Sequence, residues 1–569
     1  MVQHPFAAAL ILATLGFSCW RLVYLAFKST NAIRWTFDLE LASTALCSWI
    51  LAALLYRLTL HPLANYPGPV IAACTDWYNV YWVATGNRHL EIDKQHKTWG
   101  TTIRYGPNRI SFCSEGAHRD LGAVNANVLR SSVFSSFKKF FGVDSSATTL
   151  DPKEHAFRRR IDYQTLMPRI LQAYESRVTP HIDFMTTHLA EDLPKASSED
   201  QEGEWGPTQN MTSVLTYCIA DIMADVVFSQ PWNVQRDPRN RRPIEMLPKS
   251  TTGLLVVGHM QTVIRLGLHW VMFFPFIKDI LQFLLLAKSF ASRRASLSDH
   301  DLEGRRDIWS TLLVSKDAET GRTFTPEQLT SEAGMFVTAG TGTSILAVSS
   351  TLFYLLRYPH TLTRLAEDIR ARFSVNRTSP NQNGSTPACP ISWGSSELQN
   401  TPYLYACIYE AMRLSPGLPG FSPRVAGPGG VSLDGIWFPE GTELGIPFWS
   451  LNRDARYFPD PLTYNPDRWM PVTQGGQGLQ PGSGPAAAFT PFGQGRFGCL
   501  GRHFAMQEVT LILSHLIWLF DIRQEPRKDY GGKNGNKPEG RGCDDEFQLH
   551  DRFTGDGDGP YVQFRHRSF

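Results

Sequence analysis

A glycine-rich segment near the C-terminus ends in a cysteine. Residues 492–501 read Phe-Gly-Gln-Gly-Arg-Phe-Gly-Cys-Leu-Gly, and an apolar-periodic stretch from about Arg502 to Phe520 predicts a helix directly after them. A thiol just before a helix N-terminus is favoured as thiolate by the helix dipole and the free backbone N–H groups, and glycines let the backbone approach a flat partner. For a cysteine considered alone, a buried structural role is the common alternative. The surrounding loop favours Cys499 as a ligating thiolate beside a flat group.

A long apolar helix carries a second unusual segment. Thr-Pro-Glu-Gln at residues 325–328 predicts an N-cap with proline at the first helical position and a capping box, and the apolar pattern continues to about Tyr358. About 32 residues would span roughly 48 Å, enough to cross a domain. Inside it, residues 339–344 read Ala-Gly-Thr-Gly-Thr-Ser. Each mid-helix glycine costs up to about 1 kcal/mol relative to alanine, so the pair predicts a kink or the close approach of something flat.

Several charged residues have spacings that allow them to pair. Glu410 and Arg413 stand at i, i+3 in a helical stretch and share a face, although such pairs are common on solvated helices. Arg468 follows 55 residues after Arg413, in the sequence Asn-Pro-Asp-Arg-Trp. His155 and Arg159, four apart at a basic helix start, also share a face, with a solvated basic patch as the alternative.

Together these segments resemble the cytochrome P450 superfamily. Residues 492–501 are similar to its haem-binding pattern, Phe-x-x-Gly-x-Arg-x-Cys-x-Gly, with Phe497 in the arginine position and Arg496 one residue early. The matching residues are Phe492, Gly495, Cys499 and Gly501. The resemblance implies that Cys499 is the axial ligand of the iron in haem b, where a thiolate favours O–O cleavage. Whether Arg496 replaces the arginine missing at Phe497 stays open.

The resemblance also assigns roles to the other segments. Residues 339–344 match the oxygen-binding segment, which would set Ala339 and Gly340 against the haem. Thr343 is implied to be the oxygen-activating alcohol. Gly342 stands where the family has an acid, and a water in the room beside it is expected to complete the proton relay. The remaining implied roles are haem-propionate binding by His155, Arg159 and Arg424 and a buried structural triad of Glu410, Arg413 and Arg468.

The N-terminus is expected to hold the protein at a membrane. Residues 6–27 and 39–60 are apolar apart from charges near their ends, and about 20 such residues cross a bilayer as a helix. Two spans, or one span and one buried core helix, both fit. The expected domains are a membrane anchor at residues 1–60, a stiff Pro-rich hinge at 61–69 and a haem-thiolate catalytic domain at 70–569.

Composition excludes other classes. The 569 residues include 55 Lys plus Arg and 53 Asp plus Glu, so the formal net charge of +2 gives no reason to expect a nucleic-acid partner. Nine cysteines without a C-x-x-C pair fit neither a disulfide framework nor a zinc site. Polar Gly/Pro-rich stretches at 191–210, 373–400 and 471–485 are expected to be surface loops. The resemblance implies the cytochrome P450 fold, mainly α with a small β lobe, after one or two anchor helices.

The activity implied by the resemblance is monooxygenation of a hydrophobic small molecule with O₂, in secondary metabolite biosynthesis. NADPH–cytochrome P450 reductase is the expected partner and would supply NADPH electrons through its flavins. The expected location is the endoplasmic reticulum membrane, in contact with lipid, with the catalytic domain facing the cytosol. Two alternatives stay open: a haem-thiolate isomerase that needs no reductase, supported by Gly342, and a non-catalytic haem-binding protein, against which Thr343 counts.

Overall fold

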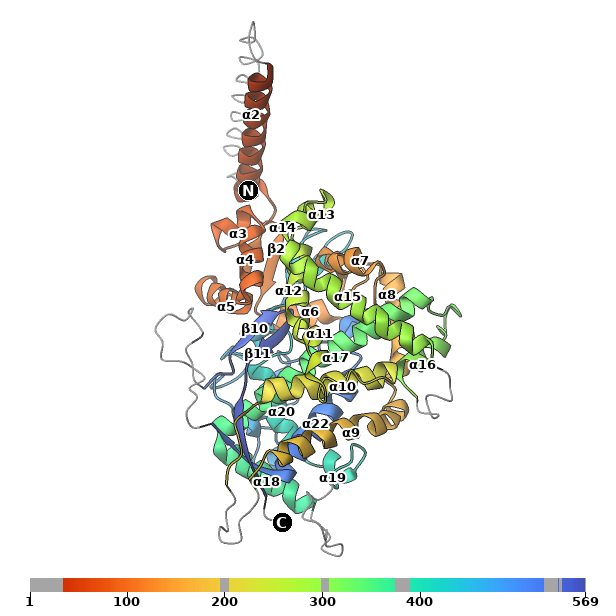
Figure 1. Ribbon diagram of the computed structural model, residues 1–569. Helices are drawn as coiled ribbons and strands as arrows, with labels where there is room; N and C mark the ends of the chain where they lie inside the picture. The colour runs from red at the N-terminus through yellow and green to blue at the C-terminus, as the bar shows by residue number, and fades with distance from the viewer. Residues whose placement is uncertain are drawn as a thin grey trace, which may run out of the picture.

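The protein is a helical body with small sheets at one side, and a single helix, α2, projects from it (Figure 1). The computed structural model describes residues 34–194, 204–297, 306–373, 389–525, 541 and 545–567. The prediction of a mainly α fold with a small β lobe is confirmed. Of the three expected surface loops, 471–485 is largely exposed, and the other two lie partly outside the described residues.

The helices and strands follow the chain from α2 to β12. The α-helices are α2 (Arg34–Leu55), α3 (Val70–Cys74), α4 (Trp77–Thr85), α5 (Arg88–Trp99), α6 (Glu115–Gly122), α7 (Ser135–Phe141), α8 (Pro152–Thr165), α9 (Pro168–Glu191), α10 (Met211–Phe228), α11 (Arg242–Glu245), α12 (Leu247–His259), α13 (Gln261–Arg265), α14 (His269–Met272), α15 (Phe274–Ala295), α16 (Ile308–Val314), α17 (Pro326–Arg357), α18 (Pro359–Arg372), α19 (Ser396–Gln399), α20 (Pro402–Leu414), α21 (Phe448–Leu451) and α22 (Arg502–Leu519). The strands are β1 (Thr102–Gly106), β2 (Arg109–Phe112), β3 (Val128–Arg130), β4 (Gln209–Asn210), β5 (Arg424–Ala426), β6 (Val431–Leu433), β7 (Ile436–Phe438), β8 (Glu443–Gly445), β9 (Phe520–Gln524), β10 (Leu549–Arg552), β11 (Thr554–Gly557) and β12 (Tyr561–His566). A π-helical turn, η1 (Tyr56–Leu60), follows α2, and short 3₁₀ turns include η4 (Pro466–Arg468) and η7 (Gly495–Phe497).

Helix α17 runs through the centre of the body and packs against α10, α20 and α22. Its C-terminal half is enclosed, with Val348 and Leu352 no more than 1% exposed. The N-terminus forms as the sequence predicts: Thr325 Oγ1 accepts from Gln328 N–H at 3.3 Å, and Gln328 Oε1 accepts from Thr325 N–H at 3.0 Å. This capping box and the buried apolar turns fix a 32-residue helix across the molecule.

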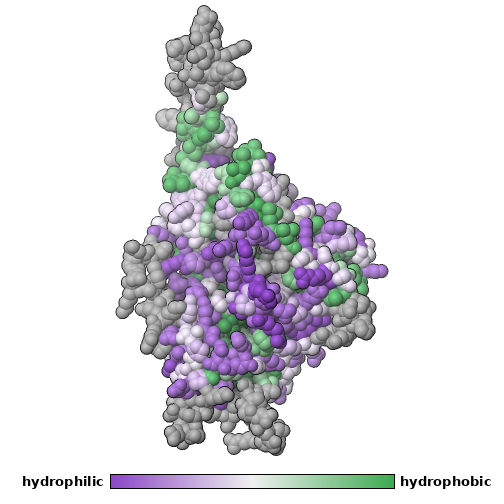
Figure 2. Space-filling view, viewed as in Figure 1, coloured by the Kyte–Doolittle hydropathy of each residue, from purple (hydrophilic) through white to green (hydrophobic). Residues whose placement is uncertain are grey.

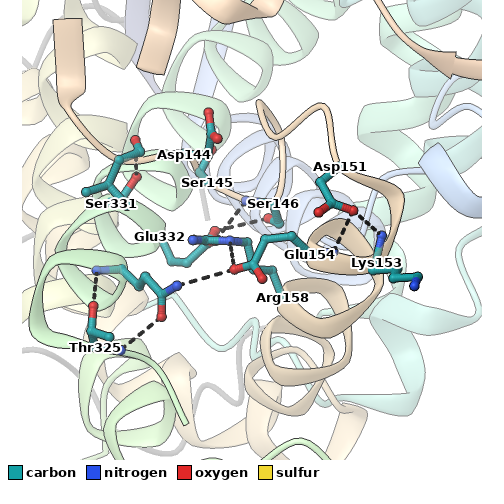
Figure 3. A network of polar contacts seen from close by, with 12 residues as sticks. Asp144, Ser145, Ser146, Asp151, Lys153, Glu154, Arg158, Thr325, Ser331 and Glu332 are labelled. Atoms are coloured by element: carbon teal, nitrogen blue, oxygen red, sulfur yellow. Dashed lines mark hydrogen bonds and ion pairs between the residues drawn. The ribbon is translucent and has the colours of Figure 1, made fainter. Parts of the chain in front are cut away.

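A buried polar network joins α8 to α17 (Figure 3). Arg158 of α8 donates to Glu332 of α17 at 2.9 Å and to Glu154 at 3.0 Å, while Ser146 donates to Glu332 through its backbone and its hydroxyl. Asp162, one turn after Arg158, is fully buried, and neither carboxylate oxygen has a hydrogen-bond partner among the described residues. Burial, followed by the negative charge of Glu332, raises the pKa of Asp162 well above its usual value. The network fixes α8, which carries His155 and Arg159, against α17, which carries Ala339 and Thr343.

Two sheets bring distant segments together. The five-stranded sheet has the order β1-β2-β8-β5-β3, and the antiparallel pairing of β3 with β5 sets Arg130 directly opposite Arg424. Near the C-terminus, β10 and β11 form a hairpin whose tip is the single residue Phe553, at φ +78°. The hairpin packs against α17.

The second apolar N-terminal segment is an exposed helix. The span Leu41–Leu60 has a mean hydropathy of 1.6 and is not buried in the body. Met211–Phe228 and Pro326–Arg357 are also long and apolar enough to cross a membrane, but 67% of each apolar window is buried, so both are core helices. The exposed span is compatible with a membrane anchor. Residues 6–27 lie outside the described residues, so the choice between one and two spans stays a prediction.

The predicted hinge is bonded to the body. Pro67 O accepts from Arg104 N–H at 2.7 Å, and Arg104 Nη1 donates to Arg57 O at 2.8 Å. A Cβ on Gly68 would stand 2.2 Å from Arg104 O, so glycine is needed where the hinge passes β1. These contacts hold the hinge in one position.

Apolar surface, here called the apolar collar, lies on the body next to the base of α2, as Figure 2 shows for one face. The collar consists of the exposed side chains Val70, Ile71, Trp77, Tyr81, Leu266, Leu268, Trp270, Val271, Met272 and Phe274. A contiguous apolar surface of this kind marks an interaction with a membrane or another protein.

Candidate active site

The loop before α22 is held by backbone contacts. Cys499 N–H donates to Phe492 O at 2.7 Å. Gly493 and Gly495 adopt φ values of +65° and +64°, a region that favours glycine. A Cβ on Gly495 would stand 2.0 Å from Gly122 O of α6, so a side chain there is excluded by packing. The glycines therefore shape the turn that sets the thiol of Cys499 at the start of α22.

The thiol environment suits a bound cation. Burial raises the pKa of the free Cys499 thiol, while a backbone hydrogen bond from Gly501 and the charges of Arg159 and Arg502 favour the thiolate. A Cβ on Gly501 would lie 3.8 Å from Cys499 Sγ, so the backbone passes close to the sulfur. A metal bound to the thiol deprotonates it outright. No group of three or more His, Cys, Asp or Glu side chains that could hold a bare metal ion occurs in the described part of the chain, so a metal here has to bring its other ligands.

Cys499 and Thr343 line one cavity of about 330 Å³, together with Ala339. Thr343 Oγ1 donates to Ala339 O at 2.8 Å. A Cβ on Gly340 would stand 2.6 Å from Met223 Cε of α10, and Gly340 lines neither this cavity nor the second one described below. Its missing side chain leaves room for Met223, and the contact of Gly340 with haem stays a prediction.

A second cavity, of about 170 Å³, lies at Gly342. Gly342 lines this cavity but not the 330 Å³ cavity, and Thr343 lines the 330 Å³ cavity but not this one. A Cβ on Gly342 would stand 3.2 Å from Thr554 Oγ1 of β11. The room that the sequence suggests beside Gly342 is therefore partly filled by a hydroxyl group.

Four buried or half-buried arginines stand near Cys499 without an acidic partner. The hydrogen bonds of Arg130, Arg424 and Arg496 go to backbone carbonyl groups and a serine, and within the described residues no carboxylate lies at ion-pair distance from these three or from Arg159. Burial and the neighbouring arginine charges lower the pKa of Arg130 to about 9 and of Arg424 to about 10. The same causes lower the pKa of His155 to about 3, so its ring is neutral. This excess of positive charge fits a dianion such as the two propionates of haem.

Three arginines surround Phe497, the residue at the position where the family pattern has an arginine. The guanidinium groups of Arg424, Arg496 and Arg130 lie 4.2, 5.0 and 5.1 Å from the ring centroid of Phe497. Arg496 donates to two backbone carbonyl groups at and just before β3, so it ties the loop to that strand. Arg130 has a buried Nε without a hydrogen-bond partner in the described part of the chain. Sequence reasoning missed Arg130, whose only signal is a cation at the end of a three-residue apolar strand.

The structural triad forms as the resemblance implies. Arg413 donates to both oxygens of Glu410, at 2.8 and 3.0 Å, and Arg468 Nε donates to Oε1 at 3.1 Å. Trp469 Nε1 and Asn465 N–H donate to the same carboxylate at 2.9 and 3.1 Å. The side chains of Glu410 and both arginines are at most 2% exposed. The triad joins α20 to the segment that contains η4.

Glu508 of α22 is a further buried acid that sequence reasoning missed. Its Oε2 accepts a hydrogen bond from the hydroxyl group of Ser344, the residue after Thr343, at 2.6 Å. Burial raises the pKa of Glu508 to about 8, against the opposing hydrogen bond from Ser344, so the carboxyl is mostly protonated at neutral pH. The sequence signal for this buried acid was a single glutamate within an apolar-periodic helix. The contact links α22, the helix that follows Cys499, to α17.

The fold and this site define a haem-thiolate protein, with one cysteine at a helix start, a cavity between it and α17, and unpaired cations for propionates. The cytochrome P450 family profile matches residues 77–536, and the chain belongs to that family. It is an oxidoreductase of the P450 monooxygenase class, with haem as its cofactor.

Known relatives cover nearly the whole chain. Cytochrome P450 monooxygenase AKT7 of Alternaria alternata is 29% identical over 523 residues, 91% of this chain and 95% of the relative. A cytochrome P450 monooxygenase of Gibberella zeae is 31% identical over 452 residues, 79% of this chain and 97% of the relative. The crystal structure of the cytochrome P450DA heme domain superposes with a TM-score of 0.65 at 15% identity, covering 86% of this chain and 95% of that one, and shows the shared fold.

Proposed function

We propose that this protein is an NADPH-dependent monooxygenase that inserts one oxygen atom of O₂ into a hydrophobic small molecule, by hydroxylation, epoxidation or successive oxidations. The observation that carries the proposal is the cavity shared by Cys499 and Thr343, which sets an iron ligand and a hydroxyl group around one space. Bound haem b supplies the activation of O₂. The chain supplies the ligand, the pocket and the proton path.

The side chains around the cavity have separate tasks. Cys499 Sγ would hold the iron, and Arg130 and Arg424, opposite each other on β3 and β5, would bind propionate oxygens. Arg159, which favours the thiolate of Cys499, and the neutral ring of His155 complete that end of the site. These residues position the cofactor.

The substrate is proposed to be apolar because the cavities are lined mainly by apolar side chains. Apolar residues of the second cavity include Phe134, Phe137, Leu254, Ile280, Met335 and Phe547. A pocket of this kind buries a hydrophobic ligand and leaves a few polar groups to orient it. The similarity to fungal monooxygenases supports secondary metabolite biosynthesis as the setting.

The electron donor is proposed to be NADPH–cytochrome P450 reductase, with flavins in the partner. A cavity of about 1170 Å³ leads from Cys499 to the surface. Its lining contains Asp151 as the one carboxylate against the exposed cations Arg169, Arg306, Lys316 and Arg502. A basic surface beside the iron ligand suits an acidic redox partner, and electrostatic attraction of this kind speeds association.

Attachment to the endoplasmic reticulum membrane, with the body in the cytosol, is the proposed location. The unburied apolar helix Leu41–Leu60 and the apolar collar at its base support contact with lipid. Both lie on the same end of the molecule in Figures 1 and 2.

A haem-thiolate isomerase that needs no reductase is the second candidate, because Gly342 lacks the usual acid. The test uses purified protein with reductase in lipid vesicles and a panel of terpenoid, polyketide, alkaloid and fatty substrates. A monooxygenase consumes NADPH and O₂ as product forms, Cys499→Ala removes the thiolate-specific absorbance of the reduced CO complex, and Thr343→Ala diverts electrons to peroxide. Thr351→Ala is the matched control, because Thr351 Oγ1 makes the same bond to the carbonyl four residues back, at 2.7 Å, away from both cavities. Product that forms without NADPH and O₂, and does not depend on Thr343, would favour rearrangement.

A further inference from the structure

The position where α17 lacks an acid is occupied from another part of the chain. Thr554 Oγ1 of β11 stands 3.2 Å from the place where a Cβ on Gly342 would begin. On the same strand, a Cβ on Gly555 would lie 2.5 Å from Leu346 Cδ2, so the hairpin is pressed directly onto the helix. The hydroxyl of Thr554 therefore takes the space that a longer side chain at residue 342 would need.

Buried contacts fix the hairpin tip in this position. Asp551 Oδ2 accepts from Arg88 Nε at 2.8 Å, and the two side chains are 0% and 2% exposed. Asp551 Oδ1 also accepts from Phe553 N–H at 3.3 Å, inside the tight turn. Gly555 N–H donates to Gly417 O at 3.0 Å, and a Cβ on Gly417 would lie 3.8 Å from Thr343 Cγ2. Gly417 thus lies next to both β11 and the Thr343 methyl group, and Thr554 and Thr343 line the same 330 Å³ cavity.

Thr554 connects the two cavities. Four residues line both of them: Ala339, Leu346, Phe553 and Thr554. Among these four, Thr554 alone has a side chain that can donate and accept a proton. Of the two cavities, Thr343 lines only the one of about 330 Å³. A proton that moves from the second cavity to Thr343 through a side chain of this wall must pass Thr554.

An acid stands behind Thr554 on the same strand. Asp556 lies two residues further along β11 and lines the second cavity, as Thr554 does, because alternate residues of a strand point to one face. Its Oδ2 lies 2.9 Å from Arg552 Nε. Burial raises the pKa of Asp556, while the charge of Arg552 opposes that shift. The polar residues Thr212, Thr216 and Ser349 also line this cavity, which suits water better than a wholly apolar wall would.

We propose that β11 supplies the proton route that α17 lacks, with Asp556 and Thr554 passing protons from the second cavity to Thr343. The inference rests on the proposed monooxygenase function. Each turnover takes two electrons from NADPH and two protons; one oxygen atom of O₂ enters the substrate and the other leaves as water with both protons. Thr554 accepts a proton on its oxygen and releases its own toward Thr343, so it ends unchanged. Asp556 loses a proton to this route and regains one from water.

The test compares the fate of O₂ in four variants, with purified haem-loaded protein, reductase and NADPH but no organic substrate, so that O₂ is reduced to water or to peroxide. Thr554→Val keeps the shape and removes the hydroxyl, and should lower the water-to-peroxide ratio by about 10²-fold, the lower end of what general acid groups contribute. Thr554→Ser should keep the ratio, and Asp556→Asn should lower it and remove its dependence on pH. The double variant Gly342→Asp/Thr554→Ala should restore it, because the carboxylate then has the space that the hydroxyl leaves.

A second measurement needs no turnover. The infrared C–O stretch of the reduced CO complex senses hydrogen-bond donors near the bound gas, so Thr554→Val and Thr343→Ala should shift it and Thr351→Ala should not. A wild-type ratio in Thr554→Val, or equal losses in Thr554→Val and Thr554→Ser, overturns the relay and leaves the proposed function standing. A haem-loaded wild-type protein that consumes no NADPH overturns both.

Discussion

Replacement of Glu410 by glutamine tests the buried triad most directly. The change keeps the shape of the side chain but removes the negative charge that faces Arg413 and Arg468, which are 0% and 2% exposed. It also leaves the two arginines, which keep their charge, facing a neutral amide, whose NH₂ group cannot accept a hydrogen bond where a carboxylate oxygen did. Breaking a buried charge network of this kind costs about 3–5 kcal/mol. Because every 1.4 kcal/mol is tenfold, the ratio of folded to unfolded protein should fall by about 10²- to 4 × 10³-fold.

The assay is urea unfolding of the haem-loaded protein, followed by haem absorbance, with haem per chain measured from the reduced CO spectrum. Asp467→Asn is the matched control. Asp467 precedes Arg468 in the chain, but its ion pair with Arg364 at 2.8 Å is 44–45% exposed, and exposed pairs contribute about 0.2–1 kcal/mol. Glu410→Gln should lose haem and unfold at clearly lower urea than the control. Equal urea midpoints and equal haem contents in the two variants would refute the role assigned to the triad.

Three further changes test the cofactor end, the α8–α17 interface and the anchor. Arg130→Leu should speed haem loss, because haem binding loses a hydrogen bond to a charged group, worth roughly 1.5–3 kcal/mol. Arg119→Leu is the control, because Arg119 is exposed, and it should leave the rate of haem loss unchanged. An unchanged rate of haem transfer from Arg130→Leu to a haem-free acceptor protein would count against the role of Arg130. Asp162→Asn should raise the melting temperature at pH 7 but not near pH 4. The folded-state pKa of Asp162 lies above the reference 3.8, so the wild type loses stability as pH rises from 3.8 toward that folded value, and asparagine cannot ionise. Equal pH profiles would contradict this sign. Removal of residues 1–60 should release the body from vesicles in flotation, with haem retained; loss of haem would place these residues in the core.

Local pattern was enough to find the main parts of the site. The Cys499 loop, the capping box at the start of α17 and the Glu410–Arg413 pair each lie within a few residues of sequence, and helix periodicity sets their geometry. The triad needed one further segment, which a family pattern supplied. These are features in which neighbouring residues act together.

The parts that sequence reasoning missed depend on long-range packing. Arg130 faces Arg424 because β3 pairs with β5, about 300 residues away in the chain, and nothing local encodes that register. Thr554 reaches Gly342 through a hairpin seated on α17. Gly340 depends on long-range packing in the same way. A mid-helix glycine predicts that some group approaches closely, but only the structure shows that Met223 of α10 is such a group.

The hydrogen bonds of the hinge set the orientation of the body relative to α2. Arg104 forms hydrogen bonds to both Pro67 and Arg57, and Arg57 lies in η1, which follows α2 directly. We therefore expect α2 to keep a fixed orientation relative to the body. With α2 in a bilayer, tumbling in three dimensions is reduced to spinning about the membrane normal. If the proposed reductase lies in the same membrane, its encounter with the basic surface beside Cys499 would need a search over one plane and one angle, which is far smaller than the search of two freely rotating proteins.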